Sequence, residues 1–544
     1  MPDYHAVKRR LSRVSIDELR NIIGSELIEM ANNGTYRMSL ADDLAEILHL
    51  KLGQNLLANR QLRYALVDGF SEQEFQSIKR LSGANIESLS DIYKYFKTFT
   101  KKKSEVLVSV LGWPQAYIMA ELIDTREACF VAKCEYGESV KLRGYLHPYQ
   151  KNIKDEINKR MNRNGARAMV QMPTGSGKTF TALETFVDLI RSPLDSDQRW
   201  LIWLVNKPDL AEQALNSFAE LWKVKGDRPL KLWRYFDEWN GPPTNVEGEE
   251  GIVFCTFDKL YIAMGERDSE AYKSMQRLAK STQYLIVDEA HMSVAETYEK
   301  VIQFLIFYGS KLIGLSATPY RSEASENSEL TQLYGSTLIN LKRDERGYEI
   351  SDPISYLQGK GYLAKVVMIP FETGTISNEE NEEKLLRELS KKPNRNLQIL
   401  NLIKDANERQ QKTMVFGCTK DHVIMLQMLC RKEGVKSRVI VGETSPTERL
   451  EIFDEFRKPD SDLYILINFE ILSTGIDLPN IDKIIMARPV KSPTQYSQMV
   501  GRALRGPKNG GNDTNEIVNL IDNLDAYGNI STLYNSFMND WMKN

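Results

Sequence analysis

Residues 171–179 of the chain read Gln-Met-Pro-Thr-Gly-Ser-Gly-Lys-Thr. This stretch follows an apolar run at 168–170 and opens into a helix-like run at 180–190. A strand, a glycine-rich turn and a helix start in this order form a phosphate cradle, because backbone N–H groups and the helix N-terminus point at one anion. We expect Lys178 to reach the β- and γ-phosphates of a nucleotide and the Thr179 hydroxyl to ligate Mg²⁺. The strict pattern has Gly where this chain has Met172, so the flanking strand and helix carry the assignment.

The composition is that of a globular protein with several domains. The chain has 544 residues, 42% of them hydrophobic and 27% charged, and its net charge is −3. We find no run long enough to span a membrane and no secretory signal. The five cysteines show no zinc spacing, so we expect reduced thiols and a cytoplasmic location. A net charge near zero means that any nucleic-acid contact must come from local patches.

From residue 168 onward, strand-like and helix-like segments alternate, which predicts parallel sheets with helices on both faces. The pattern stops at a polar, glycine-dotted stretch at 341–362 and then restarts. We therefore predict an α/β protein with a mostly helical accessory domain at 1–140, a first α/β unit at 141–345 and a second at 346–544. The predicted strands are 168–171, 200–205, 251–255, 284–287, 311–315, 365–370, 413–416, 437–441, 464–468, 483–487 and 517–520. A short helix is predicted at 531–544.

The accessory domain shows helical signals. Leu40, Leu44, Ile47 and Leu48 share a helical face, and Ser71 with Glu74 forms a capping box before a helix that Ser82-Gly83 would end. The segment 91–103 interleaves four aromatic residues with five lysines. One interpretation is base stacking with phosphate neutralisation. The favoured alternative is an amphipathic helix with core aromatics and solvated lysines.

A second constellation lies at Asp288 and Glu289, directly after the apolar strand 284–287. In a parallel sheet the carboxyl ends of strands carry the chemistry. We expect Asp288 to hold Mg²⁺ and Glu289 to orient or deprotonate the attacking water, as phosphoryl transfer requires. Arg502 and Arg505, three residues apart on an expected helix of the second unit, would supply the cation that stabilises the transition state when the units close.

Together these motifs resemble those of the superfamily 2 helicases, the DEAD/DEAH-box-like nucleic-acid motors, over roughly 141–525. The matching segments, in family order, are 147–150 (the glutamine motif), 173–179 (motif I), 204–213 (Ia), 256–258 (Ib), 288–291 (II), 316–318 (III), 414–422 (IV), 473–477 (V) and 498–505 (VI). The form of motif VI, which starts at Gln498, is more similar to double-stranded DNA translocases such as type I restriction motor subunits and excision-repair helicases.

The resemblance implies two tandem RecA-like lobes with ATP and Mg²⁺ between them. Its implied nucleotide-binding residues are Gln150, Thr174, Gly175, Ser176, Gly177, Lys178, Thr179 and Asp477. Its implied catalytic residues are Lys178, Asp288, Glu289, Arg502 and Arg505, with Arg505 as the arginine finger, and the metal ligands are Thr179 and Asp288. Thr474 of motif V would touch the nucleic-acid backbone.

The implied function is a nucleic-acid-dependent ATPase that moves on or remodels DNA, with repair, restriction or phage defence as the suggested settings. DNA is favoured over RNA, and the contacts should be mostly to the phosphate backbone. Two alternatives stay open at this point: an RNA helicase or remodeller, and an ATP-driven regulatory switch in a larger complex. Residues 1–135 would serve as a dock for a protein partner or as a grip on DNA.

Overall fold

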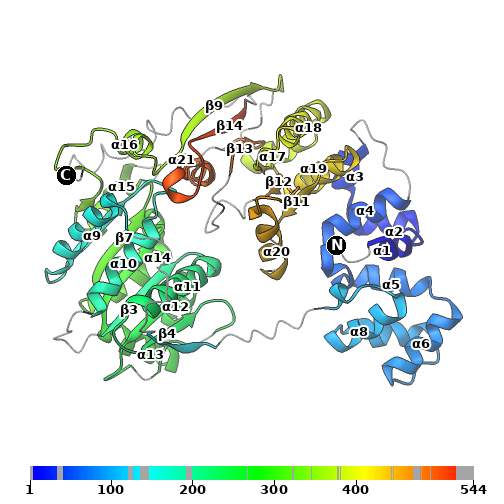
Figure 1. Ribbon diagram of the computed structural model, residues 1–544. Coiled ribbons are helices and arrows are strands. Elements are labelled where there is room, and N and C mark those ends of the chain that lie inside the picture. The colour runs from blue at the N-terminus through cyan, green and yellow to red at the C-terminus, as the bar shows by residue number, and fades with distance from the viewer. Residues whose placement is uncertain are drawn as a thin grey trace.

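The computed structural model describes residues 4–521 apart from 33–40, 120–126, 135–145, 192–198, 240, 245, 266, 321–323, 345, 376–378, 380, 443, 445, 470–477, 479–480 and 491. The described chain forms a helical domain and two parallel sheets, each flanked by helices (Figure 1). The helix predicted at 531–544, Leu40, Thr474 and Asp477 lie outside the described residues.

The described residues up to 119 are mostly helical, as the sequence predicts. The elements are α1 (Tyr4–Leu11), α2 (Ile16–Ile23), α3 (Ser25–Asn32), α4 (Ala41–Leu52), η1 (Gly53–Ala58), α5 (Arg60–Asp68), α6 (Glu72–Ser82), α7 (Leu89–Lys97), α8 (Lys101–Leu111) and η2 (Gln115–Tyr117). The capping box of Ser71 and Glu74 starts α6, and Gly83 ends it in the left-handed conformation, so both predicted signals are confirmed. Leu44, Ile47 and Leu48 of α4 are buried.

The first sheet has the strand order β1-β4-β5-β3-β6-β7-β2-β8 and is parallel except for β1. Its strands are β1 (Cys129–Ala132), β2 (Arg167–Gln171), β3 (Trp200–Val205), β4 (Leu230–Tyr235), β5 (Gly251–Thr256), β6 (Thr282–Asp288), β7 (Lys311–Ser316) and β8 (Leu338–Ile339). The helices with it are α9 (Pro148–Met161), α10 (Lys178–Arg191), α11 (Pro208–Lys225), α12 (Phe257–Met264), α13 (Glu270–Ser281), η3 (Ala290–Met292), α14 (Glu296–Phe307) and α15 (Ala324–Leu333). We call this unit lobe 1.

Two strands of lobe 1 were not predicted, β4 and β8, whereas β1 lies in the stretch from Cys129 to Leu146 where the sequence changes to short β-like pieces and turns. Strand β1 pairs antiparallel with β4, and the Arg234 guanidinium packs over the Phe130 ring. Residues 129–132 therefore belong to the sheet of lobe 1 rather than to the accessory domain. The predicted domain boundary at 140 is therefore too late for this strand, because its partner in the sheet, β4, lies about 100 residues further along the chain.

The second sheet has the order β11-β12-β10-β13-β14-β9 and all its described pairings are parallel. Its strands are β9 (Lys365–Glu372), β10 (Thr413–Phe416), β11 (Ser437–Ile440), β12 (Ile465–Asn468), β13 (Lys483–Met486) and β14 (Thr514–Ile521). Its helices are α16 (Pro353–Gly359), α17 (Glu382–Ser390), α18 (Pro393–Glu408), α19 (Lys420–Lys432), α20 (Pro446–Arg457), α21 (Pro493–Val500), η5 (Gly501–Ala503) and η6 (Pro507–Asn509). We call this unit lobe 2. Each of the predicted strands in both lobes is present, with end shifts of a few residues.

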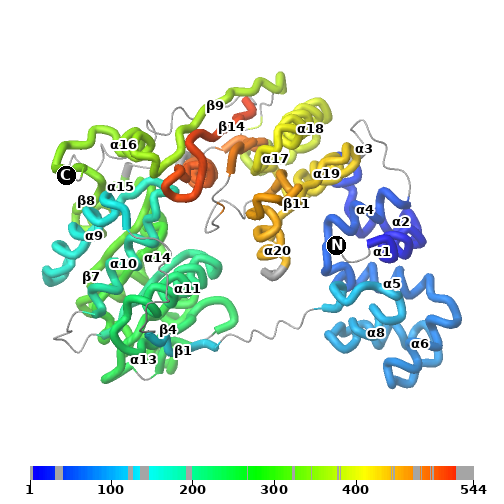
Figure 2. Tube along the Cα trace, viewed as in Figure 1, coloured from blue at the N-terminus to red at the C-terminus, as the bar shows by residue number. Residues whose placement is uncertain are grey.

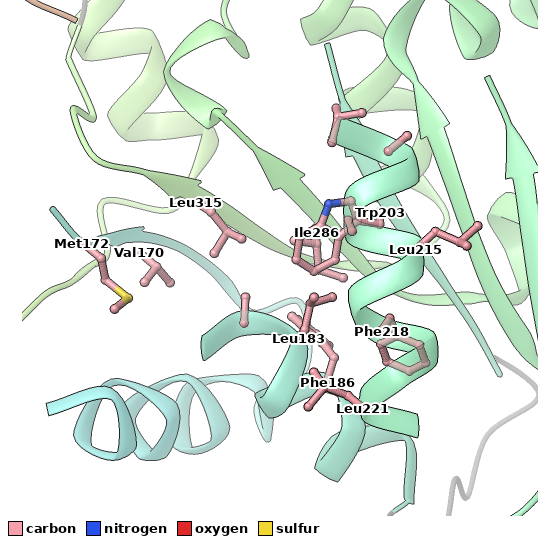
Figure 3. Close-up of a cluster of buried hydrophobic side chains, with 14 of the residues drawn as sticks. Val170, Met172, Leu183, Phe186, Trp203, Leu215, Phe218, Leu221, Ile286 and Leu315 are labelled. Atoms are coloured by element: carbon pink, nitrogen blue, oxygen red, sulfur yellow. The ribbon is translucent and has the colours of Figure 1, made fainter. Parts of the chain in front are cut away.

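The core of lobe 1 positions the glycine loop. Figure 3 shows Val170, Trp203, Ile286 and Leu315 of the sheet packing with side chains of α10 and α11. Met172, the residue that replaces the expected glycine, is only 2% exposed and joins this same cluster. Its φ is not positive, so the backbone does not require glycine there, and a long apolar side chain is accommodated by the core.

The helical domain packs on lobe 2, although β1, the next described strand after it, lies in lobe 1. Helices α3 and α4 contact α19, and buried side chains of the helical domain and lobe 2 form one continuous cluster (Figure 2). Among the described helices, none combines the length and apolarity that crossing a bilayer requires. All five cysteines are free thiols, as predicted.

Candidate functional site

The glycine loop between β2 and α10 has the backbone that a phosphate cradle needs. Gly175 and Gly177 have φ of +81° and +80°, a region that other L-residues rarely adopt. The hydroxyl of Thr174 is buried and has no hydrogen-bond partner among the described residues. A buried donor of this kind is costly unless a bound group satisfies it. The loop therefore fits an anionic ligand that accepts hydrogen bonds.

The glutamine motif lies against this loop. The Gln150 side-chain amide donates to the Ser176 carbonyl at 3.0 Å, and the Tyr149 hydroxyl donates to the same carbonyl at 2.6 Å. The Gln150 Oε1 accepts from the His147 backbone N–H at 2.8 Å and thereby caps α9. A Cβ at Gly177 would lie 2.5 Å from Gln150 Nε2, so only glycine permits this approach. Gln150 thus supports the cradle, and its expected contact with adenine stays a prediction.

Strand β6 carries the two carboxylates to the cradle. Lys178 Nζ lies 3.2 Å from Asp288 Oδ1 and 3.2 Å from Glu289 Oε1. Burial opposes the charge of Lys178, but the two carboxylates outweigh it and raise the pKa of this lysine. Burial also acts against the Glu289 carboxylate, yet Lys178 and His291 hold the pKa of Glu289 below its usual value. Both groups are therefore charged at neutral pH.

The backbone at Glu289 is strained. Its φ is +52°, which is uncommon for a residue with a side chain, and its N–H bonds to Asp288 Oδ1 at 2.9 Å. Strain of this kind concentrates at functional sites, where the surrounding fold maintains it. The left-handed turn directs the Glu289 side chain back toward Lys178.

Thr179 and Asp288 present two oxygen ligands side by side, with Thr179 Oγ1 donating to Asp288 Oδ2 at 3.1 Å. Hydroxyl and carboxylate oxygens are the ligands that Mg²⁺ prefers, usually completed by water and phosphate oxygens. The donor set therefore fits Mg²⁺ held beside the cradle.

Lobe 2 reaches the same carboxylate. The Gln498 side-chain amide lies 3.4 Å from Glu289 Oε2, although 209 residues separate the two in sequence. The positive charge of Arg502 also acts to lower the pKa of Glu289. Gly501 packs directly against Thr174 of the cradle. The sequence marked Gln498 only as a motif element, and no local signal showed that it contacts Glu289.

Arg505 lies in a different environment from the one we predicted. The α-helix ends at Val500, the η5 turn covers residues 501–503, and Arg505 forms an antiparallel bridge with Leu363. Arg502 and Arg505 therefore do not share the face of one helix. The reason is a tertiary contact: the Ala364 N–H donates to the Leu504 carbonyl at 2.9 Å and the Gly506 N–H donates to the Tyr362 carbonyl at 3.2 Å, so the chain leaves the helix to run beside 361–364.

The residues at the ends of β6 and β7 are linked behind the site. His291 Nδ1 lies 3.2 Å from Ser316 Oγ and 3.5 Å from Glu289 Oε2, and the Thr318 N–H donates to Ser316 Oγ at 3.1 Å. The segment 316–318 is thus one side chain, that of His291, away from the Glu289 carboxylate.

A second contact between the lobes was not foreseen. His147 Nε2 lies 2.8 Å from Asn509 Oδ1, and the rings of His147 and Tyr149 both pack near the Tyr362 ring at 4.5 and 4.9 Å between centroids. Tyr362 and Asn509 belong to no recognisable motif, so sequence reasoning had no means to find them.

Two family profiles match the two lobes in order. The profile described as "Type III restriction enzyme, res subunit" covers residues 143–321, and the "Helicase conserved C-terminal domain" covers residues 392–507. The chain belongs to the superfamily 2 helicases. The predicted family is thereby confirmed, together with its two RecA-like lobes.

Several curated helicases are similar over most of this chain. IRC3 of Saccharomyces cerevisiae is 24% identical over 66% of this chain and 49% of its own length. The XPB helicase/translocase subunit of the general transcription and DNA repair factor IIH from Enterocytozoon bieneusi is 26% identical over 65% and 55%. Helicase 22 of a Sulfolobus islandicus filamentous virus is 23% identical over 92% and 85%. The viral match therefore includes part of the helical domain, whereas this chain spans about half of the first two relatives.

Proposed function

We propose that this helicase couples ATP hydrolysis to movement along duplex DNA. The observation that supports it best is the convergence on Glu289: Lys178 from the cradle, and Gln498 and the charge of Arg502 from lobe 2. A site assembled from both lobes is complete only when they are closed. Hydrolysis then depends on lobe position, which is the requirement for converting chemistry into movement.

The roles of the side chains follow from their positions. The triphosphate binds along the 174–179 loop, where it competes with Asp288 and Glu289 for the ammonium of Lys178. Glu289, held charged, accepts a hydrogen bond from the attacking water and orients it. Arg502 and Arg505 stabilise the negative charge that builds on the transferred phosphoryl group. Mg²⁺ bound at Thr179 and Asp288 would neutralise charge on the β- and γ-phosphates.

The preference for DNA is supported by the motif VI sequence and by the restriction-enzyme profile over lobe 1. It is also supported by the relative named for DNA repair. Backbone contacts along the ends of 204–213 and 256–258 would make binding tolerant of sequence and sensitive to salt. We place the domain division near residue 345, between β8 and α16.

The test is steady-state ATP hydrolysis by the full chain with duplex DNA, single-stranded DNA, RNA or no nucleic acid. We expect duplex DNA to stimulate most. Glu289→Gln should lower the rate about 10²- to 10⁴-fold while leaving nucleotide binding intact, because only the positioning of water is lost. A triplex-displacement assay then distinguishes an enzyme that moves along DNA from a regulatory switch that hydrolyses ATP without moving.

Each contrary result has a separate meaning. Stimulation by RNA alone would replace the DNA motor with an RNA remodeller. Hydrolysis without displacement would indicate a regulatory switch. If Glu289→Gln hydrolyses ATP at the wild-type rate, the proposed site itself is wrong.

A further inference from the structure

The helical domain has an uneven charge distribution, and its acidic side faces lobe 2. Glu46 pairs with Arg431 at 3.3 Å and Asp43 with Lys432 at 3.1 Å, both across the contact with α19. Farther along the same interface, Lys391 lies 3.7 Å from Glu26 and 3.3 Å from Glu29. These ion pairs orient the helical domain on lobe 2, and they neutralise its acidic residues against basic residues of that lobe.

The attachment is more than a set of surface ion pairs. Leu27 and Leu48 of the helical domain and Met425 and Leu429 of α19 belong to one buried cluster. Breaking the interface would expose this apolar surface to water, which is unfavourable in proportion to its area. The helical domain and lobe 2 are therefore expected to move as one body.

A basic corner lies where α7 meets α8, and α8 lies at the other end of the helical domain from α19 (Figure 1). Lys94, Lys97 and Lys102 are exposed and Lys101 is half-buried. We call these four lysines the basic corner. Two of them stand in the first turn of α8, where the positive end of the helix dipole disfavours cations. The helix dipole therefore adds to the positive potential of the lysines, and Asp91, whose Oδ1 lies 3.6 Å from Lys94 Nζ, offsets part of it.

The structure separates the two interpretations of the segment 91–103. Phe96 is fully buried, and Phe99 is half-buried under the Arg63 guanidinium, 4.3 Å from its ring centroid. Lys103 donates to the Tyr95 and Thr98 carbonyls and ends α7. The buried Phe96 ring is thus unavailable for base stacking and Lys103 serves the fold, but the basic corner faces solvent.

We propose that the basic corner binds the phosphate backbone of the DNA on which this helicase acts, as a second contact that moves with lobe 2. The inference rests on the proposed function for the identity of the ligand. The rings of Tyr93 and Tyr95 pack against Tyr64 and Phe96 within the domain. The lysines therefore recognise phosphate charge rather than bases, so this contact suits duplex DNA and is independent of sequence. It also gives the helical domain a role in the movement, because lobe closure would displace the corner relative to lobe 1.

The test compares wild type with a K94Q/K97Q/K101Q/K102Q variant of the full chain. Binding to a labelled duplex is measured by fluorescence anisotropy over a range of salt concentrations. Each lost phosphate contact reduces the slope of log K against log salt by about 0.9, so we expect a slope smaller by about 2 to 4. The affinity difference should narrow as salt rises, and ATP hydrolysis without DNA should not change.

Two controls make the result specific. The matched K151Q/K223Q/K273Q/K458Q variant removes four exposed lysines elsewhere and should keep the wild-type slope. The corresponding Lys→Arg variant of the basic corner keeps the positive charge and should also keep the wild-type salt slope. The proposal would be overturned if the salt slope fell in the matched variant as much as in the Gln variant, or if it fell in the Arg variant.

Other outcomes are equally clear. An unchanged slope in the Gln variant overturns the basic corner while leaving the proposed function standing, provided that DNA still stimulates wild type. If the wild-type enzyme neither binds DNA nor is stimulated by it, both the basic corner and the proposed function are overturned. Unchanged DNA binding with lost binding to polyglutamate would assign the corner to an acidic protein instead.

Discussion

The contact between Gly501 and Thr174 gives a sharp test of the closed arrangement. A methyl group at Gly501 would lie 2.0 Å from Thr174 Cγ2 and 2.5 Å from Thr174 Cβ. Carbon atoms prefer a separation of about 3.5–4.0 Å, so the two lobes must part by about 1.5–2 Å in Gly501→Ala. Rotation of the Thr174 side chain cannot relieve the overlap, because Cβ itself is too close.

The substitution is otherwise tolerated. Gly501 has φ −52° and ψ −20°, a helical conformation in which alanine is favoured over glycine. We therefore expect unchanged or slightly raised thermal stability and normal nucleotide binding to lobe 1. A misplacement of about 1 Å can cost about 10²-fold in rate, so DNA-stimulated hydrolysis should fall by at least that factor.

The assay pairs steady-state hydrolysis at saturating DNA with thermal unfolding. Gly359→Ala is the matched control, because Gly359 ends α16 with open space around the added methyl group. Thr174→Gly combined with Gly501→Ala should recover part of the lost rate, since it removes both clashing atoms. Hydrolysis by Gly501→Ala within threefold of wild type would refute the idea that this contact belongs to the active state.

Three further outcomes follow from the structure. Burial lowers the pKa of His422 from 6.5 to about 3, so below about pH 6.5 the unfolded chain binds a proton that the folded chain does not bind, and the stability of the fold should fall as pH drops. The difference in urea midpoint between wild type and His422→Gln should therefore narrow from pH 7 to pH 5. A difference that stays constant would contradict this. Ser316→Ala removes the hydroxyl that contacts His291 and accepts from the Thr318 N–H, so DNA stimulation should weaken while nucleotide binding persists. Full stimulation would show that this link is not used. Deleting residues 1–119 exposes the core shared with lobe 2, so the truncated chain should unfold at a lower temperature or aggregate, and an unchanged melting temperature would show that the domain is separable.

Local patterns in the sequence were enough for each half of the site. The loop at 171–179 and the pair at Asp288 and Glu289 each follow an apolar strand, and a parallel sheet places the ends of such strands at one edge. The same reasoning missed β4 and β8, and it placed Arg505 on a helix that in the structure ends earlier, where the chain runs beside 361–363.

The sequence by itself determined the family, the order of the motifs, the two α/β units and the chemistry of the cradle, since all of these depend on neighbours along the chain. Only the tertiary structure decided that Gln498 meets Glu289, that Gln150 supports the loop, and that the helical domain packs on lobe 2. It also decided that Phe96 is core while the nearby lysines are exposed. Those outcomes depend on burial and pairing between distant segments, which hydrophobic periodicity alone does not specify.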